Sequence, residues 1–310
     1  MIVRGASEFL TTYSAVRYPV VAPTTATAAF LVSPRGFALA AESATDNRYM
    51  ANAGPDAIPA APDARLALAQ HAALADALRE SVPTVVFEGD PAAPDGVFPN
   101  NVFATVPGRV IVGAMRHAVR RREAARADIR AYFRDELGYA IVDLSTQPIV
   151  AELTGALVID RGRGIGFCGL SERCDLAGAR AMHEAFALRL TYCFELAAGE
   201  YHANVVLAQL ASRALIVAAD GFADPDDAAA IAQVYAPQVL RLTPAQKAAF
   251  SGNAIALDAQ RVWMSTTAAA ALTPQQRAEL ADFGFALREV TLDEIERAGG
   301  SLRCCVGEIY

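Results

Sequence analysis

The sequence predicts an α/β protein in which one supersecondary unit is repeated around a ring. Two apolar strands joined by a short turn, then an amphipathic helix, recur five times in the 310 residues. Four units open at Asn101, Gly155, Asn204 and Asn253, which are 54, 49 and 49 residues apart, a spacing that suits a repeat better than independent domains. With 54% hydrophobic residues, the chain can bury a large core. Five units that cannot bury their apolar faces alone most naturally close with strands inside and helices outside.

Each unit is placed by its apolar pattern. The strand pairs are predicted at residues 28–40, 100–114, 155–170, 204–219 and 253–265, as aliphatic runs joined by turn residues. The helices that follow them are predicted at residues 63–80, 120–137, 175–190, 224–236 and 273–284. The residues that open each first strand would then converge on the axis of the ring, so a site is expected there.

The helices are predicted from periodicity and capping. One apolar face recurs at i, i+4, i+7 and i+11 with Ala67, His71, Leu74 and Leu78. Thr273 precedes Pro274, which places a capping hydroxyl before a first-turn proline.

The charge pattern favours neither a nucleic-acid nor a membrane partner. The formal net charge of −7 is spread along the chain, and the basic run at residues 120–122 lies beside Glu123 in a predicted helix, where a solvated face is expected. The apolar runs stay well short of ~20 residues, and polar residues interrupt any signal-peptide core near the N-terminus. We therefore expect a cytoplasmic protein.

The cysteine pattern favours neither a disulfide framework nor a structural metal. The five cysteines are an odd number without a CxxC pair, and the histidines do not cluster at zinc-ligand spacing. No cofactor is expected.

Three polar residues stand where the predicted units open. His202 lies two residues before Asn204, and Glu152 opens the preceding unit in ELTGALVID. A carboxylate entering an apolar strand costs free energy unless it is paired or used, although an exposed strand end would explain Glu152 equally well. Asp95, in PDGVFPNN, also fits an ordinary turn, and a histidine before a strand is more often structural.

Two adjacent cysteines, Cys304 and Cys305, stand on a predicted final strand in GGSLRCCVGEIY. Because side chains alternate across a strand, only one thiol can face the axis, and the periodicity does not say which. A thiol, a histidine and a carboxylate brought together are the components of nucleophilic catalysis. A single buried cysteine, however, is usually a small core residue.

Six segments in order resemble the guanidine-modifying, or pentein, superfamily: PDGVFPNN, ELTGALVID, GLSERCD, YHANVV, FSGNAIAL and GGSLRC. The superfamily includes arginine deiminases, dimethylarginine dimethylaminohydrolases and amidinotransferases, and the chain looks most like the deiminase-related branch with citrulline-utilising hydrolases. The resemblance covers about residues 27–310, expected to be one catalytic domain, and leaves residues 1–26 as an extension of unknown role. It implies a five-bladed α/β propeller, in agreement with the repeats.

The resemblance also implies a mechanism. Cys304 would attack the central carbon of a guanidino-type group, His202 would protonate the departing amine and then activate water, and Glu152 would grip the planar nitrogen group. Arg173, in SERCD, matches the arginine that binds the substrate α-carboxylate. Arg116 lies near the place of a second such group, without a matching motif.

Two positions depart from the family pattern. Asn101 and Asn204 stand where deiminases carry aspartates, so neutral amides replace two negative charges around the substrate. With Asp95, they are expected to bind the substrate. A neutral ureido group needs both donors and acceptors, so a citrulline-like substrate is preferred over an arginine-like one.

The leading hypothesis is a cysteine-dependent hydrolase that releases ammonia from a citrulline- or arginine-like amino acid. Three alternatives stay open: a deiminase or dimethylargininase, an amidinotransferase, and a catalytically silent propeller that only binds an amino acid. The oligomeric state also stays open, a homo-oligomer included.

Overall fold

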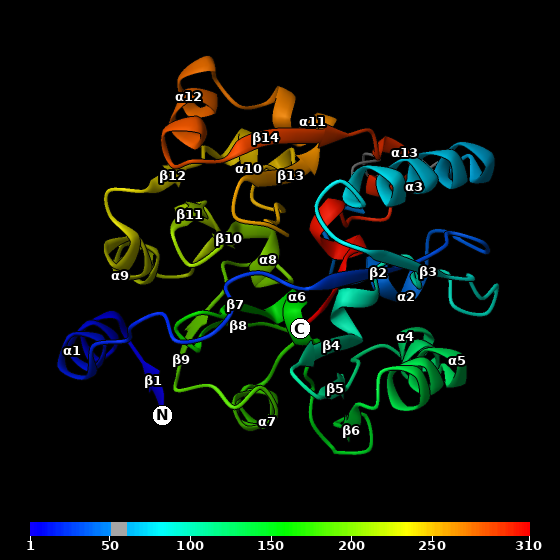
Figure 1. Cartoon of the computed structure of the whole chain (residues 1–310), viewed down its shortest axis with the longest axis horizontal. Coiled ribbons are helices and arrows are strands. Elements are labelled where there is room, and N and C mark those ends of the chain that lie inside the picture. The colour runs from blue at the N-terminus through cyan, green and yellow to red at the C-terminus, as the bar shows by residue number, and fades with distance from the viewer. Residues whose placement is uncertain (51–60) are drawn as a thin grey trace.

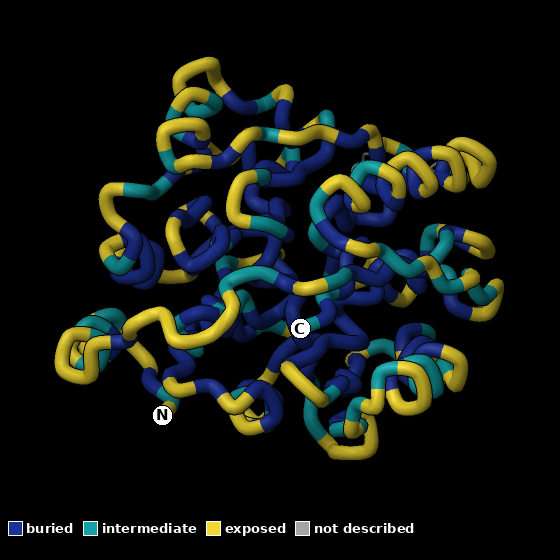
Figure 2. Tube along the Cα trace, in the orientation of Figure 1, coloured by how far each residue is buried: buried dark blue, intermediate teal, exposed yellow. Residues whose placement is uncertain are grey.

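The computed structural model describes residues 1–50 and 61–310, and Figure 1 shows sheets gathered about a centre with helices around the outside. The strands of this part of the chain form five separate sheets. In Figure 2 the centre is buried, whereas the outer helices carry exposed faces. The chain therefore has a mixed α/β fold built from repeated units.

Each unit has a third strand that the apolar pattern did not predict. In one unit, β4 (Phe103–Val106) is antiparallel to β5 (Arg109–Val112), and β6 (Ala140–Asp143) then returns parallel to β5. The same order is found in β7 (Leu157–Asp160), β8 (Ile165–Leu170) and β9 (Leu190–Glu195), and in β10 (Leu207–Leu210), β11 (Ala214–Val217) and β12 (Val239–Arg241). In the next unit, β13 (Arg261–Ser265) pairs with β14 (Ala286–Val290), and the first strand is reduced to a bridge between Ile255 and Trp263. Most returning strands are half-buried or exposed, so their hydrophobic signal is weak.

The outer helices confirm most of the predicted positions. They are α3 (Ala64–Leu78), α7 (Leu176–Ala185), α9 (Pro225–Tyr235) and α12 (Pro274–Asp282). The stretch predicted at 120–137 is divided into α4 (Ala118–Ala124), α5 (Ala127–Ala131) and the π-helical turn η2 (Tyr132–Glu136). The predicted face of α3 is buried, and Thr273 forms a capping box with Gln276 at the start of α12. The remaining short helices are α2 (Ala41–Ala44), η3 (Ala219–Gly221), α10 (Pro244–Ala248), α11 (Thr266–Ala270) and α13 (Asp293–Glu296).

The first unit is assembled from both ends of the chain, so the strand pair predicted at residues 28–40 is wrong. Only β2 (Ala28–Val32) forms there. Its antiparallel partner is β15 (Gly307–Ile309), from the C-terminus, and its parallel partner is β3 (Thr84–Phe87). A pairing between distant segments has no local turn signal, and the turn residues after β2 instead end the strand.

Three of the four residues predicted to open units at strand starts lie instead on single helical turns, and Asn253 lies in a loop. Asn101 ends η1 (Pro99–Asn101), Gly155 lies in α6 (Leu153–Ala156) and Asn204 lies in α8 (Ala203–Val206). These turns contact one another, and η1 also contacts η4 (Leu302–Cys305). The predicted convergence is therefore confirmed, although helical turns and not strand ends produce it.

The adjacent cysteines lie in η4, so the strand predicted for them is wrong. The backbone N–H groups of Cys304 and Cys305 both donate to the carbonyl oxygen of Ser301, at 3.0 and 3.3 Å. Both residues are buried. Strand alternation therefore cannot decide which thiol faces the site. The contacts of each thiol decide it instead.

The N-terminal residues extend one of the five sheets at its edge. β1 (Ile2–Arg4) pairs parallel with β9, and α1 (Ala6–Val16) packs against α9. Phe9 stacks on Tyr192 with ring centroids 4.4 Å apart. From α1 the trace passes to β2 across the face on which the C-terminus lies (Figure 1). Among the described residues, no helix has the length and apolar character needed to cross a bilayer.

Candidate active site

The thiol of Cys304 is held by two side-chain amides. Asn253 Nδ2 lies 3.3 Å from the sulfur and Asn204 Nδ2 lies 3.8 Å from it, and the Cys304 backbone N–H donates to Asn253 Oδ1 at 3.4 Å. The residue is 1% exposed. Burial raises the pKa of the Cys304 thiol, although the amide hydrogen bonds oppose this effect, so the resting thiol is protonated at neutral pH.

His202 and Glu152 form a fully buried pair. The imidazole Nε2 donates to Glu152 Oε2 at 2.9 Å. Because a carboxylate only accepts, Nε2 carries the proton and Nδ1 keeps its lone pair. Burial lowers the pKa of His202 despite the neighbouring Glu152 carboxylate, so the ring is neutral at rest. Among the described residues, Nδ1 has no hydrogen-bond partner.

Gly155 leaves the space beside this free nitrogen. A Cβ at this position would lie 2.7 Å from Asn101 Oδ1 and 2.8 Å from His202 Nδ1. Both of these atoms are buried without a hydrogen-bond partner, as is the side-chain amide of Asn100. Unpaired buried polar atoms are rare in folded proteins and indicate a place for water or a ligand. Any larger residue at position 155 would fill this space, which explains sterically why the repeat opens with glycine.

Glu152 is surrounded by donors on every side. Arg173 Nη1 lies 3.3 Å from Oε2, and the backbone N–H of Arg116 donates to Oε1 at 3.3 Å. Burial alone would raise the pKa of Glu152, but the charge of Arg173 and the hydrogen bond from His202 outweigh it and hold the pKa well below the ordinary value. The carboxylate is therefore ionised throughout the neutral range.

Arg173 and Arg116, the predicted carboxylate-binding arginines, both face Asp46. The Nε and Nη2 groups of Arg173 donate to both oxygens of Asp46, and Arg116 Nε lies 3.4 Å from Asp46 Oδ2. His117 Nε2 also lies 3.0 Å from Asp46 Oδ2. The sequence analysis missed Asp46, because an aspartate in a polar turn has no local mark of such a role.

A cavity of about 290 Å³ lies in front of Cys304. Asp95 is 3% exposed at its wall, where it accepts a hydrogen bond of 2.5 Å from Ser43 Oγ, and burial raises its pKa. The sequence analysis also missed several other residues around this cavity: Ser43, Asn47, Met50, Phe98, Arg120, Tyr201, Ala298 and Gly300. Asn253, by contrast, had a signal in the repeat spacing.

The basic run is only partly solvated, which corrects the prediction for residues 120–122. Arg121 and Arg122 are exposed, but Arg120 is 3% exposed and makes two hydrogen bonds of 2.8 Å to the buried Glu123. Arg120 also donates to the carbonyl oxygen of Phe98 at 3.1 Å. The helix α4 therefore turns one arginine inward to the cavity wall.

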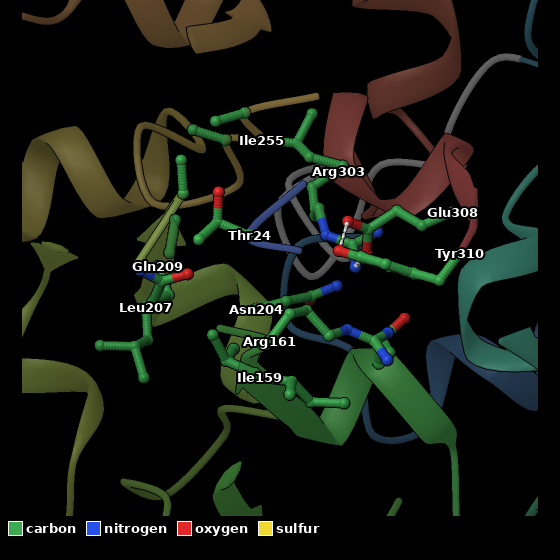
Figure 3. Close-up of a pocket in the computed structure, with 16 residues that line it drawn as sticks. Thr24, Ile159, Arg161, Asn204, Leu207, Gln209, Ile255, Arg303, Glu308 and Tyr310 are labelled. Atoms are coloured by element: carbon green, nitrogen blue, oxygen red, sulfur yellow. Dashed lines mark hydrogen bonds and ion pairs between the residues drawn. The ribbon is translucent and has the colours of Figure 1, made fainter. Parts of the chain in front are cut away.

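A second pocket, of about 490 Å³, lies behind Asn204 (Figure 3). Its charged groups are paired with one another. Arg303 lies 2.8 Å from Glu308 Oε2, the Tyr310 hydroxyl donates to Glu308 Oε1 at 2.9 Å, and the Arg161 guanidinium lies 4.3 Å from the centre of the Tyr310 ring. Asn204 thus separates two pockets, with its amide against the thiol of Cys304.

The described residues contain no group of three or more His, Cys, Asp or Glu side chains placed to hold a metal ion. All five cysteines are free and buried. Of these, Cys168 and Cys174 have sulfur atoms 3.7 Å apart.

The fold is shared with solved enzymes. The N-terminal domain of ArgZ, described as an arginine dihydrolase from the ornithine–ammonia cycle in cyanobacteria, is 19% identical with a TM-score of 0.78, over 91% of this chain and 97% of that domain. Unliganded AgrE is 19% identical to this chain, with a TM-score of 0.78. The match covers 91% of this chain and 39% of AgrE. A dimethylarginine dimethylaminohydrolase adduct gives 20% identity and a TM-score of 0.69 over 92% of this chain and 100% of that chain.

The sequence comparison identifies the family. No curated protein matches the chain. The family model described as N,N dimethylarginine dimethylhydrolase, eukaryotic, matches residues 33–310, which is most of the chain. The chain therefore belongs to the N,N dimethylarginine dimethylhydrolase family, within the guanidine-modifying (pentein) superfamily, and is a hydrolase that acts on C–N bonds other than peptide bonds.

Proposed function

We propose that this protein hydrolyses the guanidino C–N bond of an arginine-like amino acid through a covalent bond to Cys304. One observation carries the proposal: Asn204, whose amide contacts the buried Cys304 thiol, lies on the helical turn α8 that His202 caps. His202 pairs with the buried Glu152, and its Nδ1 atom has no hydrogen-bond partner among the described residues. We also propose that the five sheets are the blades of a pentein propeller and that residues 27–310 form one catalytic domain.

The contacts of the thiol favour a cationic substrate. In the described part of the chain, the hydrogen bonds of Cys304 Sγ go to the amides of Asn204 and Asn253 and not to His202. A thiol with a raised pKa needs a positive charge nearby to ionise. A guanidinium bound in front of Cys304 would supply this charge, whereas a neutral ureido group would not.

The reaction then runs in two balanced halves. The thiol sulfur bonds to the central carbon, and neutral His202 transfers the thiol proton to the nitrogen that leaves as ammonia or an amine. The remaining C–S adduct is attacked by water, which gives a proton to His202 Nδ1. The C–S bond breaks, the hydroxyl proton returns to sulfur, and the ureido product leaves. His202 gives its remaining proton to the released ammonia or to solvent, which restores the neutral imidazole and the thiol.

Substrate recognition is assigned to the surrounding charges. Glu152 and Asp95 would bind the planar nitrogen group. The side-chain amide of Asn101 would hydrogen-bond to the nitrogen atoms on the reacting carbon. Arg173 and Arg116 would bind the α-carboxylate, which would replace the carboxylate of Asp46 in the same guanidinium fork. The exchange of one carboxylate for another leaves the local charge unchanged.

A ureido substrate is the second candidate, because Asn101 and Asn204 present neutral amides where aspartates would favour a cation. Hydrolysis of citrulline by the same chemistry would release ammonia and leave ornithine and carbon dioxide. Two ArgZ structures support a shared chemistry: a cysteine-to-serine variant holds substrate, and an asparagine-to-serine variant is covalently bonded to a reaction intermediate. Arginine-like and citrulline-like substrates therefore belong in one assay.

The adjacent cysteines provide the test and its control. Replacing Cys304 by Ala should lower ammonia release by ~10³-fold or more, because the nucleophile is removed. Cys305→Ala removes a neighbouring buried thiol that packs among Leu302, Val306 and other core residues, and should leave turnover within ~3-fold. Full activity in Cys304→Ala would overturn the proposal, and inactivity confined to Cys305→Ala would move the nucleophile by one residue.

Product analysis separates the candidate activities. The assay offers arginine, dimethylarginine and citrulline, and mass spectrometry identifies the products. Citrulline from arginine supports a deiminase, dimethylamine from dimethylarginine supports a dimethylargininase, and ornithine from citrulline supports the ureido candidate. Binding of these compounds without any product would instead support a silent amino-acid-binding propeller.

A further inference from the structure

Glu200 is a buried carboxylate outside the proposed reaction. It is 5% exposed and lies two residues before His202. Lys247 Nζ, itself on a residue that is 4% exposed, lies 2.6 Å from Glu200 Oε1, and the Tyr49 hydroxyl donates to Oε2 at 2.7 Å. Lys247 also pairs with Asp220 at 2.8 Å. Both oxygens of Glu200 therefore hold other parts of the chain in place.

A buried ion pair of this kind is weak evidence for stability. The cost of removing two charges from water often exceeds their attraction, and apolar residues of similar size frequently stabilise a protein as well or better. The better-attested use of such pairs is to fix one arrangement of the elements that they join. The elements joined here are the loop before His202, helix α10 and the segment that carries Tyr49.

The segment that carries Tyr49 also forms the wall of the catalytic cavity. Ser43, Asn47 and Met50 line the cavity. The Tyr49 backbone N–H donates to Asn47 Oδ1 at 3.1 Å, so the tyrosine and the cavity residue form one local turn. Holding Tyr49 therefore holds Asn47.

The Tyr49 ring is linked to His202 through the ring of Tyr201. It packs edge-on against Tyr201 with centroids 6.0 Å apart, and Tyr201 lies 4.5 Å from the His202 ring. The Tyr201 hydroxyl and Asn47 Nδ2 both donate to the carbonyl oxygen of Gly299, in the chain just before Cys304. One cluster thus touches the cavity wall, the histidine and the turn that bears the thiol.

We propose that Glu200 is a positioning residue: by binding Tyr49 it sets the cavity wall, His202 and the Cys304 turn in one arrangement. The inference rests on the proposed roles of Cys304 and His202. Its chemistry is a buried hydrogen bond to a charged acceptor, which is stronger than a bond between neutral groups. Loss of this bond should disturb substrate capture more than the stability of the fold.

The variant that tests the inference is Tyr49→Phe, which removes one hydroxyl and leaves the ring. Its matched control is Tyr192→Phe, because the Tyr192 hydroxyl likewise donates to a buried carboxylate, Asp227, on the outer side of another blade. We expect Tyr49→Phe to lower kcat/KM by ~10-fold, mostly through KM, and Tyr192→Phe to change it by less than ~2-fold. Equal kcat/KM values in the two variants would overturn the inference.

Substitutions of Glu200 add a readout that a merely structural role would not give. Glu200→Gln keeps an oxygen acceptor for Tyr49, so it should retain several-fold more kcat/KM than Glu200→Leu. In the double variant Tyr49→Phe with Glu200→Leu, the losses should not add, because both changes break the same contact. Additive losses would overturn the inference.

A measurement that needs no turnover keeps the inference separate from the proposed function. The rate of Cys304 alkylation by iodoacetamide, followed by peptide mapping, should rise several-fold in Tyr49→Phe, because the cavity wall loosens, and stay unchanged in Tyr192→Phe. An unchanged rate in both variants contradicts the role of Glu200 even if the protein is an active hydrolase. A changed rate in a protein that turns over no substrate contradicts the proposed function alone.

Discussion

The two pockets on either side of Asn204 differ in chemistry more than in shape. The pocket behind Asn204 is larger, about 490 Å³ against about 290 Å³. Its charged side chains already have partners: Arg303 pairs with Glu308, and Arg161 donates to the Thr105 carbonyl oxygen and lies over the Tyr310 ring. The smaller cavity, in front of Cys304, is lined by a buried thiol, by Asp95, whose pKa is raised by burial, and by Asn101, whose side-chain oxygen has no partner among the described residues.

Neither volume nor a single unpaired group marks the site of chemistry, because Gln209 Nε2, behind Asn204, also has no partner in the described part of the chain. The smaller cavity differs because a thiol and the unpaired side-chain oxygen of Asn101 share its wall. A satisfied ion pair at a partly exposed position contributes little and binds nothing further. A free imidazole nitrogen and an unpaired amide, buried at His202 and Asn101, remain costly until water or a ligand fills the space between them. Matched substitutions at the two pockets turn this contrast into measurements.

The largest difference is expected between Glu152→Gln and Glu308→Gln. Each change neutralises a carboxylate that binds an arginine, with the shape preserved. Glu152→Gln removes the charge that orients His202, and should lower kcat/KM by ~10³-fold. Glu308→Gln should change it by less than ~2-fold. Steady-state ammonia release checks both variants, and comparable losses would show that the two pockets do not differ as described.

A smaller difference is expected between two amides. Asn253→Ala removes the donor 3.3 Å from the Cys304 sulfur, so the thiolate loses a hydrogen bond and kcat/KM should fall by ~10- to 100-fold. Gln209→Ala, behind Asn204, removes a side-chain nitrogen that has no partner, and both turnover and thermal stability should stay near those of the wild type. A large loss in Gln209→Ala would assign a role to the second pocket.

The smallest effect concerns the pH dependence of alkylation. Burial holds the pKa of Cys304 above its ordinary value of 9.0, so the thiolate fraction, and with it the alkylation rate, should still be rising at pH 9. A non-reacting guanidinium compound bound in the cavity should favour the thiolate and increase the rate at pH 7 by several-fold. A neutral urea compound should not. Equal acceleration by both compounds would contradict the preference for a cationic substrate.

The sequence predicted the outer parts of the fold well, because their signals are local. The buried face of α3 followed from periodicity, and the capping box of α12 followed from Thr273 and Pro274. The pairing of β2 with β15 could not be predicted in this way, since its two strands lie at opposite ends of the chain. The returning strands were missed because they are short and partly exposed.

The residues of the candidate site also differ in whether a local sequence signal marks them. The repeat openings identified Asn204, His202 and Glu152, and the family resemblance selected Cys304 from the cysteine pair and added Arg173. Asp46 and Glu200 had no such mark, because an acidic residue in a polar loop looks the same whether it is solvated or buried. Arg120 was placed on a solvated face for the same reason.

The sequence by itself determined that this protein has a mixed α/β fold of repeated units, since hydrophobic periodicity and turn residues act over short distances. It also determined which residue types are available at the openings of these units. Only the tertiary structure decided which of the two cysteines meets the amides, which nitrogen of His202 is free and which carboxylate fills the fork of Arg173. These outcomes depend on desolvation and on contacts between distant segments, and both exist only in the folded chain.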